Sequence, residues 1–325
     1  MDEVIWVVSD VHLGGAGSNH TAFAEFLKAV CEDRGQFIEG EKHVDAPSKL
    51  VLLGDILELW DPLGDDLKNT ALHLFESLES LFAVSEEIIF VTGNHDEALE
   101  TFQAVYPMKN PLFQIRGRHY PEAEPRYIQV GEYRYFFLHG HQFDKLFLWL
   151  GRFSQIPSFM AGLNRVFARF IPFDGWILPV VFSFFALLQF ITSWPPASVL
   201  YVTFILSIPR LFTYLQGPFW KVFRQFLTNR PKHKDIATIV EKQYYNRKKD
   251  TISADVIVYG HTHVPEVSPQ HISEKLGKTL INTGSWVEDD SKIANNTVVV
   301  IDSSGARLLE WMGPEKGFKV LGSFP

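Results

Sequence analysis

The chain has 325 residues, of which 46% are hydrophobic, so it can bury one large core or two smaller ones. A formal net charge of −8 argues against a protein whose partner is a nucleic-acid polymer. The single cysteine, Cys31, excludes an internal disulfide and a thiolate metal site, and it favours a reducing compartment. The N-terminus lacks a basic segment followed by an apolar run, so we expect no secretory signal.

The first predicted strand, Val4–Ser9, ends in two potential metal ligands. Asp10 and His12 follow it directly. Because side chains alternate along an extended chain, both can reach the same cation. Apolar residues at helical spacing over Thr21–Val30 then predict a helix that crosses to the next strand.

The next two predicted strands also end in polar side chains. Lys49–Leu53 runs into Asp55, and Ile88–Thr92 runs into Asn94 and His95. Strands that alternate with helices predict a parallel sheet, whose chemistry lies at the carboxyl ends of its strands. An amide oxygen can bind a metal, and the adjacent imidazole can act on the same substrate, although such a tetrapeptide alone could be only a turn.

Two later predicted strands end in pairs of histidines. The pairs are His139 and His141 after Arg134–Leu138, and His261 and His263 after Asp255–Tyr259. One such histidine would be interpreted as a hydrogen-bonded core or surface residue, but five strand ends with polar groups indicate a metal site. Oxygen and imidazole ligands without sulfur suit Mn²⁺, Fe or Zn²⁺, and their number is enough for two ions. Two ions suit an in-line phosphoryl displacement.

The order of these blocks resembles that of the calcineurin-like metallophosphoesterases. The matching blocks are Asp10-x-His12, Gly54-Asp55, Gly93-Asn94-His95-Asp96, His139 and Gly260-His261-x-His263. The resemblance implies an α/β fold, a four-layer αββα sandwich of two mixed sheets flanked by helices. It also implies an enzyme that hydrolyses phosphoesters or diphosphates with two divalent metal ions, which we expect to be Mn²⁺, with Fe or Zn²⁺ as the alternatives.

The same resemblance implies a role for each residue. One ion would be held by Asp10, His12 and His263, and the other by Asn94, His139 and His261. Asp55 would bridge the two ions, His95 would protonate or stabilise the leaving oxygen, and Asp96 would orient His95 from behind. His141 could take the place of His139, but the spacing of the blocks favours His139.

A segment after the second strand resembles a narrower group, the UDP-2,3-diacylglucosamine diphosphatases of lipid A synthesis. The similar residues are Gly54-Asp55-Ile56-Leu57-Glu58-Leu59-Trp60 and Gly64-Asp65-Asp66. The best-characterised members of that group carry arginine where this chain has His95, which puts the substrate in question rather than the chemistry. Glu58-Leu59-Trp60 is compatible equally with a substrate contact and with the start of a helix.

An apolar segment interrupts the predicted enzyme. No charged residue lies between Asp174 and Arg210. Trp176–Trp194 approaches the roughly 20 apolar residues that cross a bilayer, and the following Ala197–Ile208 is shorter. Prolines between them predict a hairpin. We therefore predict a helical, membrane-associated insert over residues 144–249, with the hairpin at about 174–209, within a catalytic domain of residues 1–143 and 250–325.

Basic residues flank this hairpin on both sides. They are Lys145, Arg152, Arg165 and Arg169 before it, and Arg210, Lys221, Arg224, Arg230, Lys232 and Lys234 after it. Positive flanks place both ends on the cytoplasmic face of a membrane and attract anionic lipid head groups. Arg152, Arg165 and Arg169 are also candidates to bind the substrate phosphates. The alternative is a helical subdomain that packs on the catalytic core or on a second copy.

The C-terminal part contains three further predicted strands, Leu280–Thr283, Thr297–Asp302 and Ala306–Met312, which we expect to be antiparallel. Together, these patterns favour hydrolysis of a nucleotide-diphosphate lipid. One alternative is a phosphodiesterase that acts on a soluble nucleotide, with the insert as an anchor. Another is a membrane scaffold with a structural metal site, but such a site would not need a proton donor such as His95.

Overall fold

A computed structural model describes the two β-sheets and part of the helical segment between them. The described residues are 3–15, 17–32, 37–39, 42–44, 46–59, 85, 87–97, 99, 113–117, 119–123, 125–143, 177–193, 198–205, 253–268, 277–288 and 295–325. The chain divides into two compact units, one of Met1–Leu148 with Arg230–Pro325 and one of Trp149–Asn229. The predicted insert boundaries, 144 and 249, lie outside the described residues and stay a prediction.

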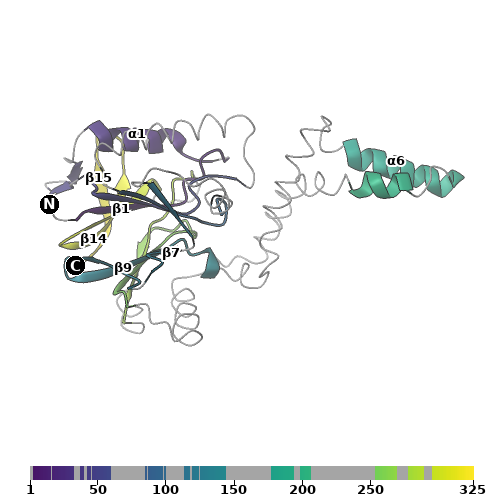
Figure 1. Ribbon diagram of the computed structural model, residues 1–325. Helices are drawn as coiled ribbons and strands as arrows, with labels where there is room; N and C mark the ends of the chain where they lie inside the picture. Colours follow the sequence, from purple (N-terminus) through teal and green to yellow (C-terminus); the bar gives the residue numbers. More distant parts are fainter. Residues whose placement is uncertain are drawn as a thin grey trace. The chain divides into compact units, whose positions relative to one another are not determined.

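The larger unit contains a seven-stranded mixed sheet in the order β15-β14-β13-β1-β4-β5-β6 (Figure 1). Its strands are β1 (Ile5–Val8), β4 (Lys49–Leu53), β5 (Glu87–Val91), β6 (Phe113–Arg116), β13 (Thr297–Asp302), β14 (Gly305–Trp311) and β15 (Phe318–Phe324). Strands β1, β4, β5 and β6 are parallel. The other three form an antiparallel extension that joins β1 through β13. The carboxyl ends of β1, β4 and β5 therefore meet at one edge.

A second mixed sheet has the order β11-β12-β10-β9-β7, with β8 also paired to β9. Its parallel centre is β9 (Tyr133–Leu138), β10 (Val256–Tyr259) and β12 (Thr279–Asn282). The antiparallel strands are β7 (His119–Tyr120), β8 (Ile128–Val130) and β11 (Glu266–Val267), and a separate small hairpin consists of β2 (Phe37–Glu39) and β3 (Lys42–Val44). A 3₁₀ turn, η1 (His141–Phe143), follows β9.

Alternation of side chains along β1 assigns each face of the first sheet to a different core. Ile5 and Val7 are fully buried in a cluster that they share with residues of β9 and β10, so this core lies between the two sheets. Trp6 points the other way, into a cluster with α1 (His20–Glu32), where its ring centroid is 5.7 Å from that of Phe26. Asn19 caps the start of that helix.

These layers confirm the predicted α/β class with mixed sheets, and the strands before the metal-site blocks lie within one residue of their predicted bounds. The predicted antiparallel pairing of 280–283 is found only with β11, because β12 pairs in parallel with β10 on its other side. All four residues of β12 are buried. Burial of a whole strand is typical of an inner parallel strand that is covered on both faces. A helix over the outer face of the second sheet is not among the described residues.

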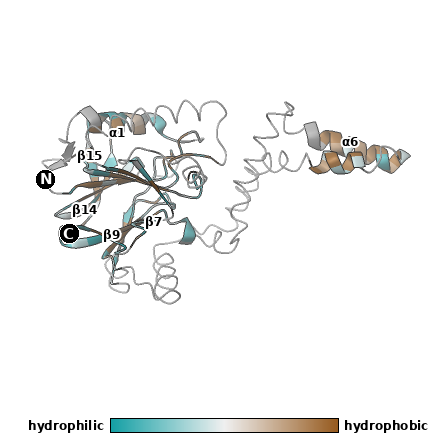
Figure 2. Cartoon of the chain, in the orientation of Figure 1, coloured by the Kyte–Doolittle hydropathy of each residue, from teal (hydrophilic) through white to brown (hydrophobic). Residues whose placement is uncertain are grey.

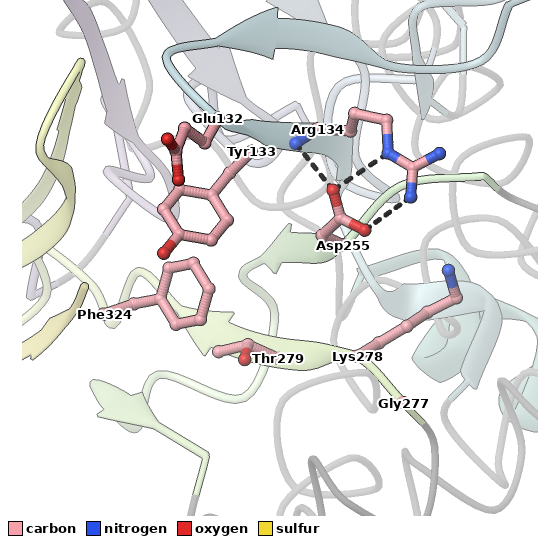
Figure 3. Close-up of a pocket in the computed structure, with 8 residues that line it drawn as sticks. All are labelled: Glu132, Tyr133, Arg134, Asp255, Gly277, Lys278, Thr279 and Phe324. Carbon is pink, nitrogen blue, oxygen red and sulfur yellow. Dashed lines mark hydrogen bonds and ion pairs between the residues drawn. The ribbon is translucent and has the colours of Figure 1, made fainter.

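The amino ends of the second sheet are held by an ion pair (Figure 3). The Arg134 guanidinium donates to both carboxylate oxygens of Asp255, at 2.9 and 2.6 Å. A pocket of about 720 Å³ lies beside this pair, lined by Glu132, Tyr133, Arg134, Asp255, Gly277, Lys278, Thr279 and Phe324. The predicted metal ligands follow the opposite ends of the same strands.

The smaller unit contains two apolar helices, α6 (Ile177–Thr192) and a second whose described part covers residues 198–205. Both are coloured largely as hydrophobic in Figure 2. The rings of Phe182 and Phe204 pack with their centroids 5.1 Å apart, so the two helices lie against each other. Within the described part of the chain, no helix combines the length and the apolar character needed to cross a membrane.

Candidate metal centre

Backbone hydrogen bonds join the loops that follow β1 and β4. The N–H of Asp10 donates to Gly54 O (3.0 Å), and the N–H of His12 donates to Asp55 O (2.9 Å). A further bond runs from the N–H of Glu58 to Leu13 O (2.9 Å). The second sheet repeats this device, because the Gly260 N–H donates to His139 O at 2.9 Å. Neighbouring strands thus bring their terminal loops into a fixed register.

Backbone strain is concentrated in these loops. Among the described residues, seven other than glycine have a positive φ, and five of them are predicted metal ligands. The five are Asp10 (52°), His12 (51°), Asp55 (52°), His261 (71°) and His263 (58°). The left-handed region is unfavourable for residues that carry a Cβ, and such strain gathers at functional sites. It re-aims each side chain at the end of its strand.

The first predicted ligand set comes together in space. Side-chain ligand atoms of Asp10, His12 and His263 all lie within 4.8 Å of one another. Asp10 Oδ1 is 3.2 Å from His263 Nε2. The other oxygen of Asp10 accepts hydrogen bonds from the Ser9 hydroxyl and from the His261 N–H (2.9 Å). Asp10 is therefore held with one oxygen directed into the site.

The second predicted set lies next to the first and shares Asp55 with it. Ligand atoms of Asp55, His139 and His261 also lie within 4.8 Å of one another. Asp55 Oδ2 is 3.1 Å from His139 Nε2 and 3.8 Å from His12 Nε2, so this oxygen lies between histidines of the two predicted sets. Asn94 follows β5 beside them, because the N–H of His95 donates to Asp55 Oδ1 at 2.8 Å.

The structure favours His139 over His141 as the ligand from β9. The Nδ1 of His139 hydrogen-bonds to Leu53 O at 3.0 Å, which leaves Nε2 toward Asp55. His141 is buried with its ring centroid 5.5 Å from that of His139, and it does not belong to any of the ligand groups found among the described residues.

Several of the donor atoms that a metal would use are left without hydrogen bonds by the protein. Within the described residues, four such buried atoms belong to predicted ligands, namely Asp10 Oδ1, His12 Nε2, Asn94 Oδ1 and His139 Nε2. Buried polar atoms are rarely left unbonded, and each exception needs an explanation. Two oxygens and two imidazole nitrogens directed into one region fit divalent cations. The residues therefore fit a dimetal centre.

The pKa values of the buried ligands also indicate a site that attracts cations. Burial alone would lower the pKa of His139, but Asp55 and Asp10 outweigh it and raise that pKa to about 10. Burial raises the pKa of the Asp10 carboxyl, but His139 and His263 outweigh it and lower the pKa to about 2. Two buried carboxylates thus draw positive charge to one point, and bound cations would supply that charge in place of protons.

Glu58 contacts both a predicted metal ligand, His12, and the predicted proton donor, His95. Its Oε2 lies 3.0 Å from His12 Nδ1 and 2.7 Å from His95 Nδ1, and its Oε1 lies 2.9 Å from the same His95 nitrogen. These contacts leave the Nε2 of His12 for the metal and orient the ring of His95. Burial raises the pKa of the Glu58 carboxyl, but His95 and His12 outweigh it and lower the pKa well below the ordinary value.

Sequence reasoning left Glu58 undecided between a helix start and a substrate contact, and the structure gives it a third position, behind two histidines. The available signal was a carboxylate within the apolar run Ile56-Leu57-Glu58-Leu59, three residues after a metal ligand. Glu58 is only 7% exposed. A carboxylate so deeply buried is almost always paired.

The Asp96 carboxylate accepts hydrogen bonds from the backbone, whereas Glu58 contacts the His95 ring. Its carboxylate accepts from the N–H groups of Gly93 (2.6 Å), Ile56 (2.8 Å) and Leu57 (3.3 Å). Burial and the nearby Asp55 raise the pKa of Asp96 to about 7, against the effect of these bonds. The carboxylate on the His95 ring is thus that of Glu58, while Asp96 fixes the loops after β4 and β5.

The comparisons with known proteins agree with this geometry. The model of the calcineurin-like phosphoesterase family matches residues 4–177, more than half of the chain. The chain belongs to the calcineurin-like phosphoesterase family. The last predicted ligands, His261 and His263, lie beyond the matched residues, and the structure brings both into the same site. None of the curated proteins matches the chain.

Solved structures of metallophosphoesterases are similar to the chain at low sequence identity. A dimetal phosphatase from Danio rerio is 10% identical, with a TM-score of 0.40 over 99% of this chain and 98% of that one. A metallophosphoesterase from Sphaerobacter thermophilus is 13% identical (TM-score 0.33; 100% and 90% covered). A predicted phosphoesterase from Streptococcus pneumoniae is also 13% identical (TM-score 0.32; 99% and 97% covered). The assignment to the family does not depend on these similarities.

Membership of this family makes the protein a metal-dependent phosphoester hydrolase. That result excludes the alternative of a non-catalytic scaffold with a structural metal site. The three arginines predicted to bind substrate, Arg152, Arg165 and Arg169, lie outside the described residues.

Proposed function

We propose that the protein hydrolyses a nucleotide-diphosphate lipid, such as UDP-2,3-diacylglucosamine, at this centre. The observation that carries the proposal is the pairing, in one chain, of a phosphohydrolase centre with the exposed apolar helix α6. A lipid-linked diphosphate needs both, because its head group must reach the metal ions while its acyl chains stay out of water. The resemblance of residues 54–60 to the diacylglucosamine diphosphatases supports the same substrate.

The proposed ligand sets use the atoms that face one another in the structure. Asp10, His12 and His263 would hold one ion, Asn94, His139 and His261 would hold the other, and Asp55 would contribute to both. We propose Mn²⁺ for both positions, because the donors are oxygen and imidazole without sulfur. Two bound ions supply charge neutralisation for the attacking and leaving oxygens of an in-line phosphoryl displacement.

His95 is the proposed proton donor to the leaving phosphate oxygen. Its Nδ1 is engaged by Glu58, so Nε2 is the nitrogen that can carry a proton toward substrate. Its backbone N–H is also fixed, by the bond to Asp55 Oδ1 at 2.8 Å. The ring therefore keeps one orientation next to the bridging carboxylate, which is the condition for efficient general acid catalysis.

The basic residues 152, 165 and 169 are proposed to bind the diphosphate. They lie in sequence between the β9 loop, which carries His139, and the uncharged segment 175–209. Guanidinium groups bind phosphate oxygens in pairs, so they suit a diphosphate better than lysines would. We propose that the same segment brings the enzyme to the cytoplasmic face of a membrane, where such a substrate would lie.

The test is hydrolysis of matched substrates by the full-length protein loaded with Mn²⁺ in mixed micelles. UDP-2,3-diacylglucosamine, its deacylated form and bis-p-nitrophenyl phosphate should all be hydrolysed, with the largest kcat/KM for the acylated form. Water enriched in ¹⁸O should place one label in a single phosphate product, because water supplies one oxygen to the phosphorus that it attacks. Equal kcat/KM for the acylated and deacylated forms would contradict the lipid substrate.

The second candidate is a phosphodiesterase that acts on a soluble nucleotide. It is favoured by His95, which replaces the arginine of the best-characterised diacylglucosamine diphosphatases. A histidine donates one proton to a single leaving oxygen, whereas arginine can grip two phosphate oxygens at once. A preference for a soluble cyclic or linear phosphodiester over both sugar nucleotides would support this candidate and remove the first.

A further inference from the structure

The two helices of the smaller unit carry most of the exposed large hydrophobic side chains. Of the twelve such side chains found among the described residues, ten lie on α6 and on residues 198–205. Phe190 is 90% exposed, Ile191 69% and Tyr201 68%. Monomeric proteins rarely expose a contiguous apolar patch of this kind unless another molecule covers it.

The exposed side chains on α6 form an outward stripe that a surface helix would normally make polar. Val180, Phe184, Leu187 and Ile191 are spaced by four, three and four residues, and each is more than half exposed. The inward side carries Phe182, which packs on Phe204 of the second helix. Even so, no α6 residue whose exposure is described, from Val180 onward, is fully buried. The hairpin is thus apolar on its packed side and on its outer side.

A partner that surrounds the hairpin fits this pattern better than one that covers a single face. A protein groove, or a second copy of the chain, would bury one stripe and leave the rest in water. Hydrocarbon covers a helix on all sides, and a helix that is apolar all round is typical of that environment. Lipid is therefore the partner that accounts for Phe190 and Tyr201 as well as for the outward stripe.

Two threonine hydroxyls in the two helices form hydrogen bonds that suit a medium without water. The Thr192 hydroxyl donates to Leu188 O at 2.7 Å, and the Thr203 hydroxyl donates to Val199 O at 2.8 Å. Both bonds run to the carbonyl four residues earlier, so each hydroxyl proton is used within its own helix. In hydrocarbon an unbonded donor would cost several kcal/mol, whereas in water this bond is unnecessary.

The charges in the sequence fit the same partner. Residues 175–209 contain no Asp, Glu, Lys or Arg, and clusters of Arg and Lys precede and follow them. Because a hairpin returns the chain to the side from which it entered, both basic clusters would meet the same layer of head groups. Anionic head groups attract such clusters by about 1 kcal/mol for each basic residue near the surface.

We propose that α6 and the helix at 198–205 form a hairpin that inserts into a lipid bilayer, held together by the contact between Phe182 and Phe204. The partner is a bilayer that contains anionic lipid, and both basic flanks lie at the surface through which the hairpin enters. This inference goes beyond the proposed hydrolysis, because the hairpin would insert whether or not the substrate is a lipid.

The first experiment is flotation of the full-length protein with vesicles. One set contains phosphatidylcholine alone, and the other contains phosphatidylcholine with one third phosphatidylglycerol. The wild type should float with both and more strongly with the anionic set. The triple variant Phe184→Gln, Leu187→Gln and Ile191→Gln should partition at least about 10²-fold less into vesicles, since each buried apolar side chain contributes about 1.5–3 kcal/mol.

The matched control changes exposed hydrophobic residues outside the hairpin. Met312 and Val320 are 42% and 45% exposed, and the double variant Met312→Gln and Val320→Gln should float as the wild type does. The triple variant should hydrolyse bis-p-nitrophenyl phosphate at the wild-type rate, which shows that the catalytic unit is folded. A wild type that stays with the soluble fraction in both vesicle sets would overturn the proposal.

A second measurement separates insertion from self-association. A bimane label on Phe190→Cys, made in a Cys31→Ser background, should shift to shorter emission wavelengths with vesicles and be quenched by lipids brominated on the acyl chain. A label that stays in a polar environment, together with a dimer in light scattering that the triple variant dissolves, would assign the hairpin to a second copy. Asp55→Asn should float normally, so a failed substrate assignment leaves this result unchanged.

Discussion

Folded proteins usually bury apolar side chains and expose charged ones. The metal centre and the α6 hairpin are opposite exceptions to this rule. At the metal centre, charged groups such as Asp10 and Asp55 are buried, at 0% and 2% exposure. In the hairpin, apolar groups such as Phe184 and Phe190 are exposed, at 60% and 90%. Each arrangement is unfavourable in water on its own. Each becomes favourable once a component from outside the chain is added, a cation at the metal centre and, in our proposal, lipid at the hairpin.

The two regions also differ in how their side chains are held. Asp10 and Glu58 each form two or more side-chain hydrogen bonds, and Asp55 forms one, and these bonds decide which atom faces the site. The apolar side chains of the hairpin are held by packing, such as that between Phe182 and Phe204. A single substitution should therefore have a large effect in the first region and a small one in the second. The following experiments measure that difference, from the largest effect to the smallest.

The largest loss is expected from Asp55→Asn. One carboxylate oxygen lies between histidines of both ligand sets, so its replacement should weaken both ions together. The kcat for bis-p-nitrophenyl phosphate should fall by more than about 10³-fold, beyond the loss of a single positioned donor. Metal analysis by mass spectrometry should find fewer than two ions per chain. Two ions with near-normal turnover would remove Asp55 from the bridging position.

His95→Ala should affect chemistry and not metal content. Loss of a general acid lowers kcat by about 10²–10⁴-fold, while both ions stay bound because this side chain is not a proposed ligand. The exposed His20→Ala serves as the control and should behave as the wild type. If His95→Ala loses an ion, then His95 is itself a ligand, an arrangement that its grouping with His12 and Asp55 would permit.

Glu58→Gln should lower both the metal affinity and kcat, the former by less than Asp55→Asn does and the latter by less than either substitution above. Changes behind a metal ligand typically cost 10–100-fold in metal affinity or activity. Here one substitution removes the carboxylate from both His12 and His95. In the double variant with His95→Ala, the loss in kcat should be less than the product of the separate losses. Glu310→Gln, which removes a surface carboxylate paired with Lys319, should leave both metal affinity and kcat unchanged.

The smallest effects should appear when apolar side chains are shortened in the two regions. Ile89→Val, in the core between the sheets, should lower the free energy of unfolding by about 0.5–1.5 kcal/mol. Phe184→Ala removes far more apolar surface, yet it should change that free energy by less than about 0.5 kcal/mol in the absence of lipid. Urea denaturation followed by circular dichroism measures both. A larger loss for Phe184→Ala would show that a protein surface covers the hairpin.

The sequence predicted the strands and most of the candidate site because these depend on short segments. Apolar runs that end in Asp10, Asp55 or His139 indicate both the strand and the place where its chemistry lies. Glu58 could not be placed in the same way, since its partners His12 and His95 are 46 and 37 residues away. Its position depends on the register between β1, β4 and β5, which only the assembled sheet provides.

The parallel pairing of β12 was missed for a related reason. A four-residue run such as Thr279–Asn282 looks the same in a parallel and in an antiparallel sheet, and only its neighbours in the fold, β10 in parallel and β11 antiparallel, show that it takes part in both kinds of pairing. The positive φ angles of five ligands were also not predicted, because aspartate and histidine adopt a left-handed backbone more often than most residues but far less often than glycine. The apolar character of residues 177–205 was evident from the sequence, whereas the exposure of residues 180–193 and 198–205 required the structure.

The order of segments along the chain has a consequence for biosynthesis. The catalytic unit is discontinuous, and β10, which pairs with β9, is synthesised only after the whole of Trp149–Asn229. His261 and His263 arrive later still. A ribosome therefore releases the apolar hairpin before it has made the residues that complete the metal centre. Hydrolytic activity cannot begin until the hairpin has left the ribosome. Any partner that the hairpin binds can therefore be bound before the enzyme is able to hydrolyse a substrate.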